Sequence, residues 1–181
     1  MSDASSAPIG PNAAIPADDP NRTLTVADPD SSNVRHVAVA GGTYSILVSG
    51  AQTAGRYCLI DMIVPDSSGP PLHRHDFEEM FTLLEGELEF TFRGETTTVR
   101  AGSSVNIPAD APHVFKNTSG STVHMLCMCA PAGQEEFFVE VGDPLDSRTS
   151  PLPKLDKVGM EERMKRAKAL AEKYHTELLK P

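Results

Sequence analysis

Short β-prone runs separated by turn residues fill the chain from residue 34 to residue 140. In residues 87–92, Leu and Phe side chains alternate with polar ones, as they do on a strand with one buried face. The pattern predicts strands near residues 34–40, 43–49, 56–64, 79–84, 87–93, 96–100, 103–107, 112–116, 122–129 and 135–140. Since no helical pattern lies between these strands and no internal repeat is visible, we expect an all-β fold with a single antiparallel sandwich or barrel.

The two ends of the chain differ from this central region. Residues 1–33 are rich in Pro, Ala, Ser and Asp without lasting periodicity, which predicts an N-terminal arm that is either flexible or laid over the domain. Three prolines between residues 142 and 157 exclude a regular element there. We therefore expect an arm (1–33), a barrel (34–141), and a Pro-rich connector with a C-terminal helix (142–181).

The C-terminal helix is predicted at residues 157–179 by apolar residues that recur at alternating steps of four and three. Asp156 is placed to cap its first turn. The apolar stripe consists of Met160, Met164, Ala167, Ala171, Tyr174 and Leu178. We expect this stripe to pack on the barrel or on a partner subunit rather than to carry chemistry.

Composition narrows the classes of partner. The net charge is −9 and no basic stretch interrupts it, so neither nucleic acid nor an anionic membrane surface is an expected partner. No apolar run approaches the roughly 20 residues of a membrane span, and the N-terminus lacks the pattern of a secretory signal. The three cysteines lie among apolar neighbours, as reduced and partly buried thiols do. We expect a cytoplasmic protein.

Two stretches contain the candidate metal ligands. His73 and His75 have the same parity on a strand and lie about 6.6 Å apart along it, so both imidazoles can reach one ion. Glu79 has the same parity and adds a carboxylate if no bulge intervenes. A third histidine, His113, lies on a later strand that only barrel closure brings near. Together these residues predict a site for one divalent metal ion.

Both stretches resemble the two sequence motifs of the cupin superfamily. The first motif, H-x-H-x3-E-x6-G, is matched without a gap by His73, His75, Glu79 and Gly86. The second, G-x5-P-x-G-x2-H-x3-N, is matched at all but its inner glycine by Gly102, Pro108, His113 and Asn117. The motifs cover residues 69–117, and the flanking strands extend the resemblance to roughly residues 34–140.

Two positions depart from the motifs. Gly69 lies two residues too close to His73 to be the leading glycine of the first motif, and Asp110 replaces the inner glycine of the second. Asp tolerates positive φ better than most residues, so we expect the turn to be retained. The Pro-rich tail and closing helix are similar to those of small single-domain cupins related to quercetin dioxygenases.

The resemblance implies a single antiparallel cupin β-barrel (a double-stranded β-helix, or jelly roll) with a C-terminal helix. It implies that His73, His75, Glu79 and His113 bind one divalent transition metal per chain, which can be Fe, Ni, Mn, Co or Zn. An octahedral ion would keep two positions open for water, dioxygen or substrate. The resemblance to quercetinases also implies a catalytic role for Glu79 as a base, and a permanent ligand without acid–base function is the alternative.

The function that this site predicts is a metal-dependent dioxygenase acting on a small enol, phenol or oxo-acid. A metal-dependent isomerase, cyclase or lyase is one alternative, and a non-catalytic cupin that binds a small ligand is another. No helix-turn-helix segment is apparent, which disfavours a transcription factor. Since cupins often dimerise through sheet edges or swapped N-terminal strands, we expect a homodimer in which the arm or the C-terminal helix forms contacts.

The remaining histidines and cysteines have simpler interpretations. His124 and His36 lie in strands and are expected to be hydrogen-bonded rather than metal-binding. His175 is expected to be solvated, and Cys127 and Cys129 to be core thiols that share one face of a strand.

Overall fold

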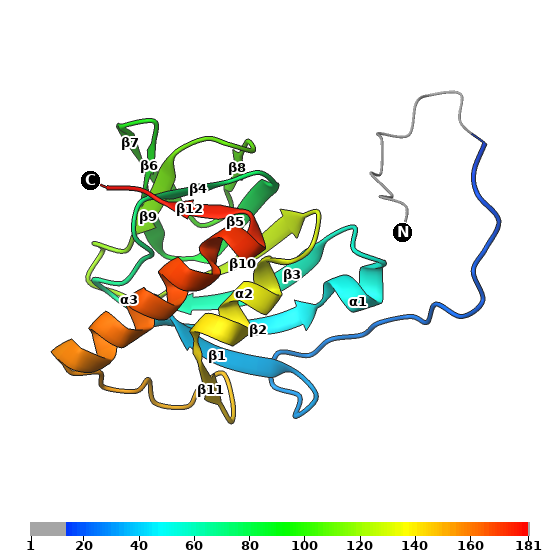
Figure 1. The fold of residues 1–181 in the computed structure, drawn as a ribbon, viewed down its shortest axis with the longest axis horizontal. Helices are drawn as coiled ribbons and strands as arrows, with labels where there is room; N and C mark the ends of the chain where they lie inside the picture. Colours follow the sequence, from blue (N-terminus) through cyan, green and yellow to red (C-terminus); the bar gives the residue numbers. More distant parts are fainter. Residues whose placement is uncertain (1–13, 181) are drawn as a thin grey trace.

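Two antiparallel sheets form the molecule in the computed structural model, which describes residues 14–180 (Figure 1). The larger sheet has the order β11-β1-β2-β3-β10-β5-β8. Its strands are β1 (Arg35–Val39), β2 (Gly42–Val48), β3 (Cys58–Val64), β5 (Glu78–Glu85), β8 (Ser104–Ile107), β10 (Val123–Ala130) and β11 (Asp143–Leu145). The smaller sheet has the order β12-β4-β9-β6-β7. Its strands are β4 (His73–His75), β6 (Glu87–Phe92), β7 (Glu95–Arg100), β9 (His113–Lys116) and β12 (Thr176–Leu178).

The core lies between the two sheets and follows the alternation seen in the sequence. In β10, every second side chain from Val123 to Cys129 is buried, while the residues between them are partly exposed. Rings from both sheets meet in the core: Phe81 of β5 lies 5.4 Å and 5.5 Å, between centroids, from Phe90 of β6 and Phe115 of β9. Burial of such rings stabilises the fold by about 1.5–3 kcal/mol each as an upper estimate. The predicted all-β jelly roll with a C-terminal helix is confirmed.

One predicted strand, at residues 135–140, is instead the helix α2 (Gln134–Val141). Phe137, Phe138 and Val141 are β-prone, but they are buried at helical spacing on one face. The ring of Phe138 lies 5.0 Å from that of Tyr44 in β2, centroid to centroid. Packing against the sheet therefore overrides local propensity. A short helix, α1 (Gly50–Thr53), was also not predicted; the side chains of Ser49 and Gln52 form its capping box.

The prediction that residues 142–157 contain no regular element is wrong for β11. Pro144 pairs with Val37 at the outer edge of the larger sheet. An edge strand tolerates proline because one side of its backbone has no partner strand and needs no N–H donor.

The predicted helix at residues 157–179 ends early. The observed α3 spans Lys157–Ala171 and begins at Asp156, whose carboxylate accepts a hydrogen bond from the Gly159 N–H, as expected for a cap. A short 3-10 helix, η1 (Glu172–Tyr174), follows, and His175 has φ +52°. The chain then forms β12, which pairs antiparallel with β4 and covers its edge. Tertiary pairing therefore decides where the helix ends.

Residues 14–33 form no helix or strand, and towards its N-terminal end this segment extends away from the barrel (Figure 1). Two contacts connect this part of the predicted arm to the domain: Arg22 Nη2 donates to the Gln52 carbonyl over 3.2 Å, and Asp30 Oδ1 lies 2.9 Å from Arg148 Nε. The rest of the predicted arm, residues 1–13, lies outside the described residues. Strand exchange and the homodimer stay predictions.

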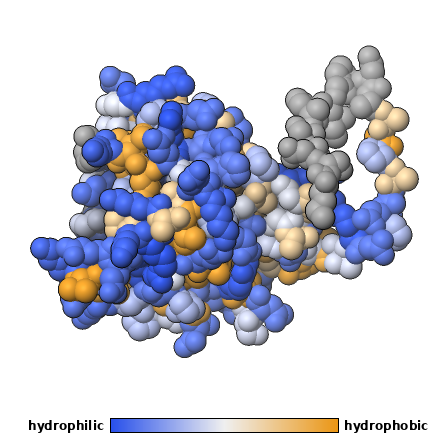
Figure 2. All heavy atoms as spheres, in the orientation of Figure 1, coloured by the Kyte–Doolittle hydropathy of each residue, from blue (hydrophilic) through white to orange (hydrophobic). Residues whose placement is uncertain are grey.

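The surface carries its apolar residues in small patches on a largely hydrophilic face (Figure 2). Met160 and Met164 of α3 are 56% and 37% exposed, so the predicted stripe is only partly covered within one chain. Among residues 14–180, no helix is both long and apolar enough to cross a lipid bilayer.

Candidate metal centre

The four predicted ligands come together inside the barrel from three strands. β4 carries His73 and His75, β5 carries Glu79, and β9 carries His113. His73 pairs with His113 across the β4–β9 ladder, which confirms that barrel closure brings the third histidine to the first two. Ring centroids of His73 and His113 lie 4.3 Å apart, and those of His75 and His113 lie 4.8 Å apart.

Strand parity does not explain why the side chain of Glu79 faces the histidines. β4 and β5 belong to different sheets, and the chain crosses between them at Asp76 and Phe77. The shared parity of His75 and Glu79 is therefore a coincidence of spacing. The crossing point is held by the ring of Phe77, which stacks on His75 with centroids 3.8 Å apart.

The geometry of the cluster fits one metal ion. One ligand atom from each residue lies within 4.8 Å of all the others. Ligand atoms on opposite sides of an ion lie about 4.2 Å apart at ordinary metal–nitrogen distances. Small inward movements of these side chains would therefore bring all four ligand atoms into contact with one ion. All four side chains are buried: His73 is 8% exposed, and the other three are 3% exposed or less.

The tautomer of each histidine follows from its outer hydrogen bond. Each Nδ1 atom lies 2.8–2.9 Å from a backbone carbonyl oxygen two residues away, at Pro71, Phe77 and Ala111. A carbonyl oxygen only accepts, so each Nδ1 carries the hydrogen and donates it. In the neutral ring, Nε2 is then unprotonated and presents a lone pair to the centre. This is the orientation that metal-binding histidines adopt.

The contacts of Glu79 show that the cluster needs a cation. Its Oε2 lies 3.2 Å from Nε2 of both His75 and His113. With neutral rings these contacts would place lone pairs against a carboxylate oxygen, which also only accepts. Either added protons or one divalent ion at this position removes the repulsion. The donor set of three imidazoles and one carboxylate thus fits a transition-metal ion, without deciding which.

The titration behaviour of two ligands fits cation binding as well. Burial raises the pKa of Glu79, but the contacts with His113 and His75 lower it more, so the pKa lies well below its usual range. Burial, followed by the charge of His113, lowers the pKa of His73 to about 4. At neutral pH the centre therefore contains an ionised carboxylate and a neutral His73 imidazole, as metal ligation requires.

Two thiols contact the other oxygen of Glu79. Its Oε1 accepts from Cys127 Sγ over 3.3 Å and from Cys129 Sγ over 3.7 Å. Both cysteines are fully buried on β10, as predicted, but their contact with the candidate ligand was not foreseen. Cys129 pairs with Glu79 in the β10–β5 ladder. The hydrogen bond with Cys129 lowers the pKa of Cys127, but burial and the charge of Glu79 raise it to about 12, so this thiol stays protonated and can donate.

Both departures from the sequence motifs have a local explanation. Asp110 has φ +66°, so the turn that a glycine usually makes is retained, and its N–H donates to the His75 carbonyl over 2.6 Å. At Gly69, where φ is +155°, a Cβ atom would lie 2.3 Å from the Phe115 carbonyl oxygen. Gly69 therefore lets the segment before His73 pass close to β9.

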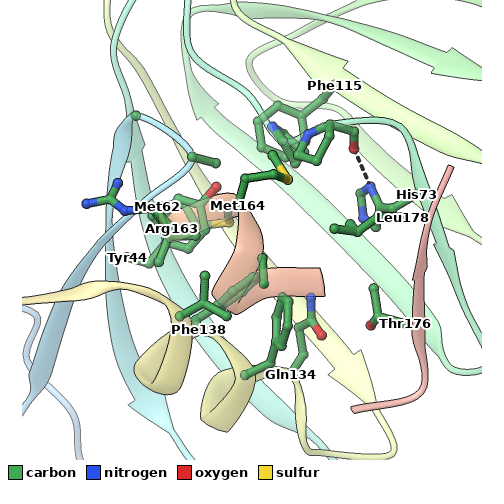
Figure 3. Close-up of a pocket in the computed structure, with 18 of the residues that line it drawn as sticks. Tyr44, Met62, His73, Phe115, Gln134, Phe138, Arg163, Met164, Thr176 and Leu178 are labelled. Atoms are coloured by element: carbon green, nitrogen blue, oxygen red, sulfur yellow. Dashed lines mark hydrogen bonds between the residues drawn. The ribbon is translucent and has the colours of Figure 1, made fainter. Parts of the chain in front are cut away.

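A cavity of about 420 Å³ opens beside the cluster (Figure 3). His73 and Glu79 form part of its wall, and most of the rest is apolar. Phe81 and Phe115 of the barrel line it. The missed part of the wall comes from α2 and α3. The sequence predicted a strand in place of α2, and it predicted the helix α3 without a role in a cavity. The cavity volume suits a small organic ligand.

The other histidines lie outside this cluster. His124 Nε2 lies 2.5 Å from Asp61 Oδ1, and His36 Nδ1 lies 2.8 Å from Ser45 Oγ, so both are hydrogen-bonded as predicted. The side chain of His175 is 70% exposed, as expected.

Comparisons with known proteins agree with this geometry. A family model described as a cupin domain matches residues 60–129. Quercetin 2,3-dioxygenase of Bacillus subtilis is 26% identical over 138 residues, which cover 76% of this chain and 40% of that protein. An uncharacterized protein of Methanocaldococcus jannaschii is 33% identical over 79 residues, which cover 43% of this chain and 63% of that protein. The chain thus spans less than two thirds of the length of either relative.

A solved structure shares the fold. The polyketide cyclase RemF from Streptomyces resistomycificus superposes with a TM-score of 0.53 at 23% identity, over 60% of this chain and 80% of that chain. At this identity the likeness concerns the fold alone.

Proposed function

The chain contains a cupin domain, and from this premise we propose that it is a metal-dependent dioxygenase that acts on a small enol, phenol or oxo-acid. The observation that carries the proposal is the buried group of three imidazoles, with Nε2 directed at one point, and a carboxylate. The similarity to a protein named quercetin 2,3-dioxygenase supports the choice of oxygenase chemistry.

Each of the four residues has a defined task in this proposal. His73, His75, His113 and Glu79 would hold one Fe, Ni, Mn, Co or Zn ion. When bound, such an ion supplies a Lewis acid that binds and polarises a substrate oxygen. Pro71, Phe77 and Ala111 keep the imidazoles in the ligating tautomer through their carbonyl groups.

The cavity wall provides the remaining functions. Its aromatic side chains exclude water and orient a ring-shaped substrate. Of the residues in the wall, Glu79 is the only carboxylic acid. A proton released by a substrate hydroxyl at the centre would therefore pass to Glu79 Oε2, which faces the histidines there.

Elemental analysis of protein purified without a metal-affinity step tests the proposal first. We expect about one Fe, Ni, Mn or Co ion per chain, and loss of that ion in His113→Ala. His175→Ala is the matched control, because it removes an exposed histidine outside the cluster and should keep the ion. Protein that contains no metal, and takes up none on reconstitution, would contradict the proposal.

Oxygen consumption with a flavonol, a diketone and a catechol tests the reaction type. Uptake of dioxygen that requires the ion supports the dioxygenase. Bound zinc without oxygen uptake would favour an isomerase, cyclase or lyase, in which the same site polarises a carbonyl group. A small molecule that raises the melting temperature and is recovered unchanged would favour a non-catalytic binding protein.

A further inference from the structure

The cavity beside the candidate metal centre has a second wall that comes from helices. α2 contributes Gln134, Phe137, Phe138 and Val141, and α3 contributes Met160, Arg163, Met164 and Ala167. The two helices pack against each other over the barrel (Figure 1). Both lie after residue 129, where the match to the cupin family model ends. This wall therefore lies outside the matched domain.

Gln134 places an unpaired acceptor in this wall. The residue is 3% exposed, and its Oε1 has no hydrogen-bond partner among the described residues. Figure 3 shows the side chain among the residues that line the cavity, near Thr176. A buried amide oxygen without a donor is unfavourable, so native proteins nearly always pair such atoms. A hydroxyl or N–H group of a ligand in the cavity would donate the missing hydrogen bond to Gln134 Oε1.

Arg163 places an unpaired donor in the same wall. Its Nη2 binds the carboxylate of Asp143, while its Nε is buried and has no partner among residues 14–180. Arg166 also approaches Asp143, with Nη2 3.6 Å from Oδ1. Two guanidinium groups thus share one carboxylate, and the local charge stays positive. An acceptor oxygen, above all an anionic one, would satisfy the Nε–H and this charge.

The rest of the wall sets the shape of the ligand. Apart from the metal-centre residues, it is mostly aromatic and aliphatic, with Tyr44, Phe81, Phe115, Phe137 and Phe138 supplying the rings. A volume of about 420 Å³ lies within the range of cavities that bind drug-sized molecules. Rings favour flat, apolar ligands, and the two unpaired atoms add defined polar positions.

We propose that Gln134 and Arg163 are specificity-determining residues that bind a hydroxyl and an acceptor oxygen of a flat, mostly aromatic substrate. The substrate class is an aromatic molecule with phenolic hydroxyl and carbonyl, carboxylate or phenolate groups beyond those that bind at the metal centre. The inference rests on the proposed function in one respect: it assumes that another part of the substrate binds at the metal centre. The contacts of Gln134 and Arg163 themselves do not depend on which reaction follows.

Binding of two related probes tests the proposal without turnover. The probes are 3-hydroxyflavone and quercetin, which has the same skeleton with further phenolic hydroxyls. Dissociation constants are measured without oxygen, on metal-loaded and on chelator-treated full-length protein. The wild type should bind quercetin more tightly. Gln134→Met and Arg163→Met should each reduce this preference about 10-fold or more, and should change binding of 3-hydroxyflavone less than about threefold.

Two further variants separate the effect of the Arg163 Nε–H from that of its charge and its helix. Arg163→Lys retains the positive charge next to Asp143 but lacks the Nε–H, so it should also lose the preference. Arg166→Met is the matched control, because Arg166 is on the same helix and near the same carboxylate but does not line the cavity. It should keep the wild-type preference. Thermal melting confirms that each variant is folded.

The outcomes separate this inference from the proposed function. A wild type that binds both probes equally, or neither, overturns the inference, as does an unchanged preference in folded Gln134 and Arg163 variants. Loss of preference in these variants supports it, even if the protein holds no metal and consumes no oxygen. That last combination would reject the dioxygenase and leave the specificity residues in place.

Discussion

At the residue scale, Glu79 connects the histidine cluster to the thiols of β10, because its two carboxylate oxygens face different neighbours. Oε2 faces the histidines, while Oε1 accepts from the thiols of β10. A permanent ligand and a catalytic base are both compatible with this arrangement, and one substitution distinguishes them.

Glu79→Gln keeps an oxygen for the ion but removes the proton acceptor. We expect the metal content to stay near the wild-type value, because three imidazoles remain, while turnover falls about 100-fold or more. Metal analysis and oxygen consumption on the same sample measure both effects. Full activity in Glu79→Gln would rule out the base, and loss of the ion would assign Glu79 as an obligatory ligand.

Cys127 is expected to position Glu79. Its thiol donates to Oε1 over 3.3 Å and so keeps Oε2 directed at the histidines. Cys127→Ala should weaken metal binding about 10-fold, as measured by chelator competition, whereas Cys127→Ser retains a donor and should have a smaller effect. Cys58→Ala is a matched control, because Cys58 is equally buried but not in hydrogen-bond contact with Glu79. Equal losses in the Cys58 and Cys127 alanine variants would indicate a packing effect only.

At the element scale, β12 protects the strand that carries two of the ligands. It pairs with β4 through Thr176↔His75 and Leu178↔His73, and Leu179 N–H donates to the Leu72 carbonyl over 2.9 Å. Without β12, the edge of β4 would be open to solvent. The end of the chain therefore supports the geometry of the metal centre although it contributes no ligand.

Deletion of residues 176–181 should loosen the centre. We expect amide hydrogens of residues 73–75 to exchange faster with deuterium, and the free energy of unfolding to fall by about 1–2 kcal/mol through the lost strand pairing. Exchange measured by mass spectrometry and urea unfolding check these effects. Glu177→Ala in the full chain is the control: it removes only the exposed Arg74–Glu177 ion pair and should change stability by less than about 1 kcal/mol. Unchanged exchange in the deletion variant would contradict the role of β12.

At the scale of the whole molecule, the buried centre couples stability to pH. The pKa of His73 falls from 6.5 to about 4 on folding. Between these values the unfolded chain binds more protons than the folded one, so stability decreases as pH is lowered through this window. For metal-free protein we expect a loss of up to about 3 kcal/mol between pH 6.5 and pH 4. Urea unfolding at several pH values should show this slope, and His73→Gln should flatten it; an equal slope in the variant would exclude His73 as its source.

We propose that the protein is a homodimer. Ile15, Leu24 and Val26 are each more than 85% exposed along the N-terminal segment, and Val158 and Met160 are exposed on α3. A partner subunit would cover such residues. Light scattering at micromolar concentration should give twice the chain mass, and deletion of residues 1–33 should reduce it to the mass of one shortened chain. A monomeric mass for the full chain would contradict the proposal.

The sequence by itself determined most of the strands, though not β11 or β12, and the identity of the four clustered residues. Alternation places Leu88 and Phe90 in the core, and the match of the histidines and Glu79 to the two cupin motifs indicated one cluster. Such patterns are local, because a strand buries one face whatever surrounds it. These patterns can be recognised without knowing which strands pair with one another.

Tertiary structure decided what depends on segments far apart in the chain. The sheet crossing that directs Glu79 to the histidines, the thiols of β10 behind it, and the end of α3 at Ala171 all depend on which strand pairs with which. The helical wall with Gln134 and Arg163 is of the same kind. Residues 134–141 are β-prone as a sequence and helical in the fold, because burial of Phe138 against Tyr44 outweighs local propensity. Burial and strand pairing over long sequence separations are properties of the folded chain, so no local pattern could indicate them.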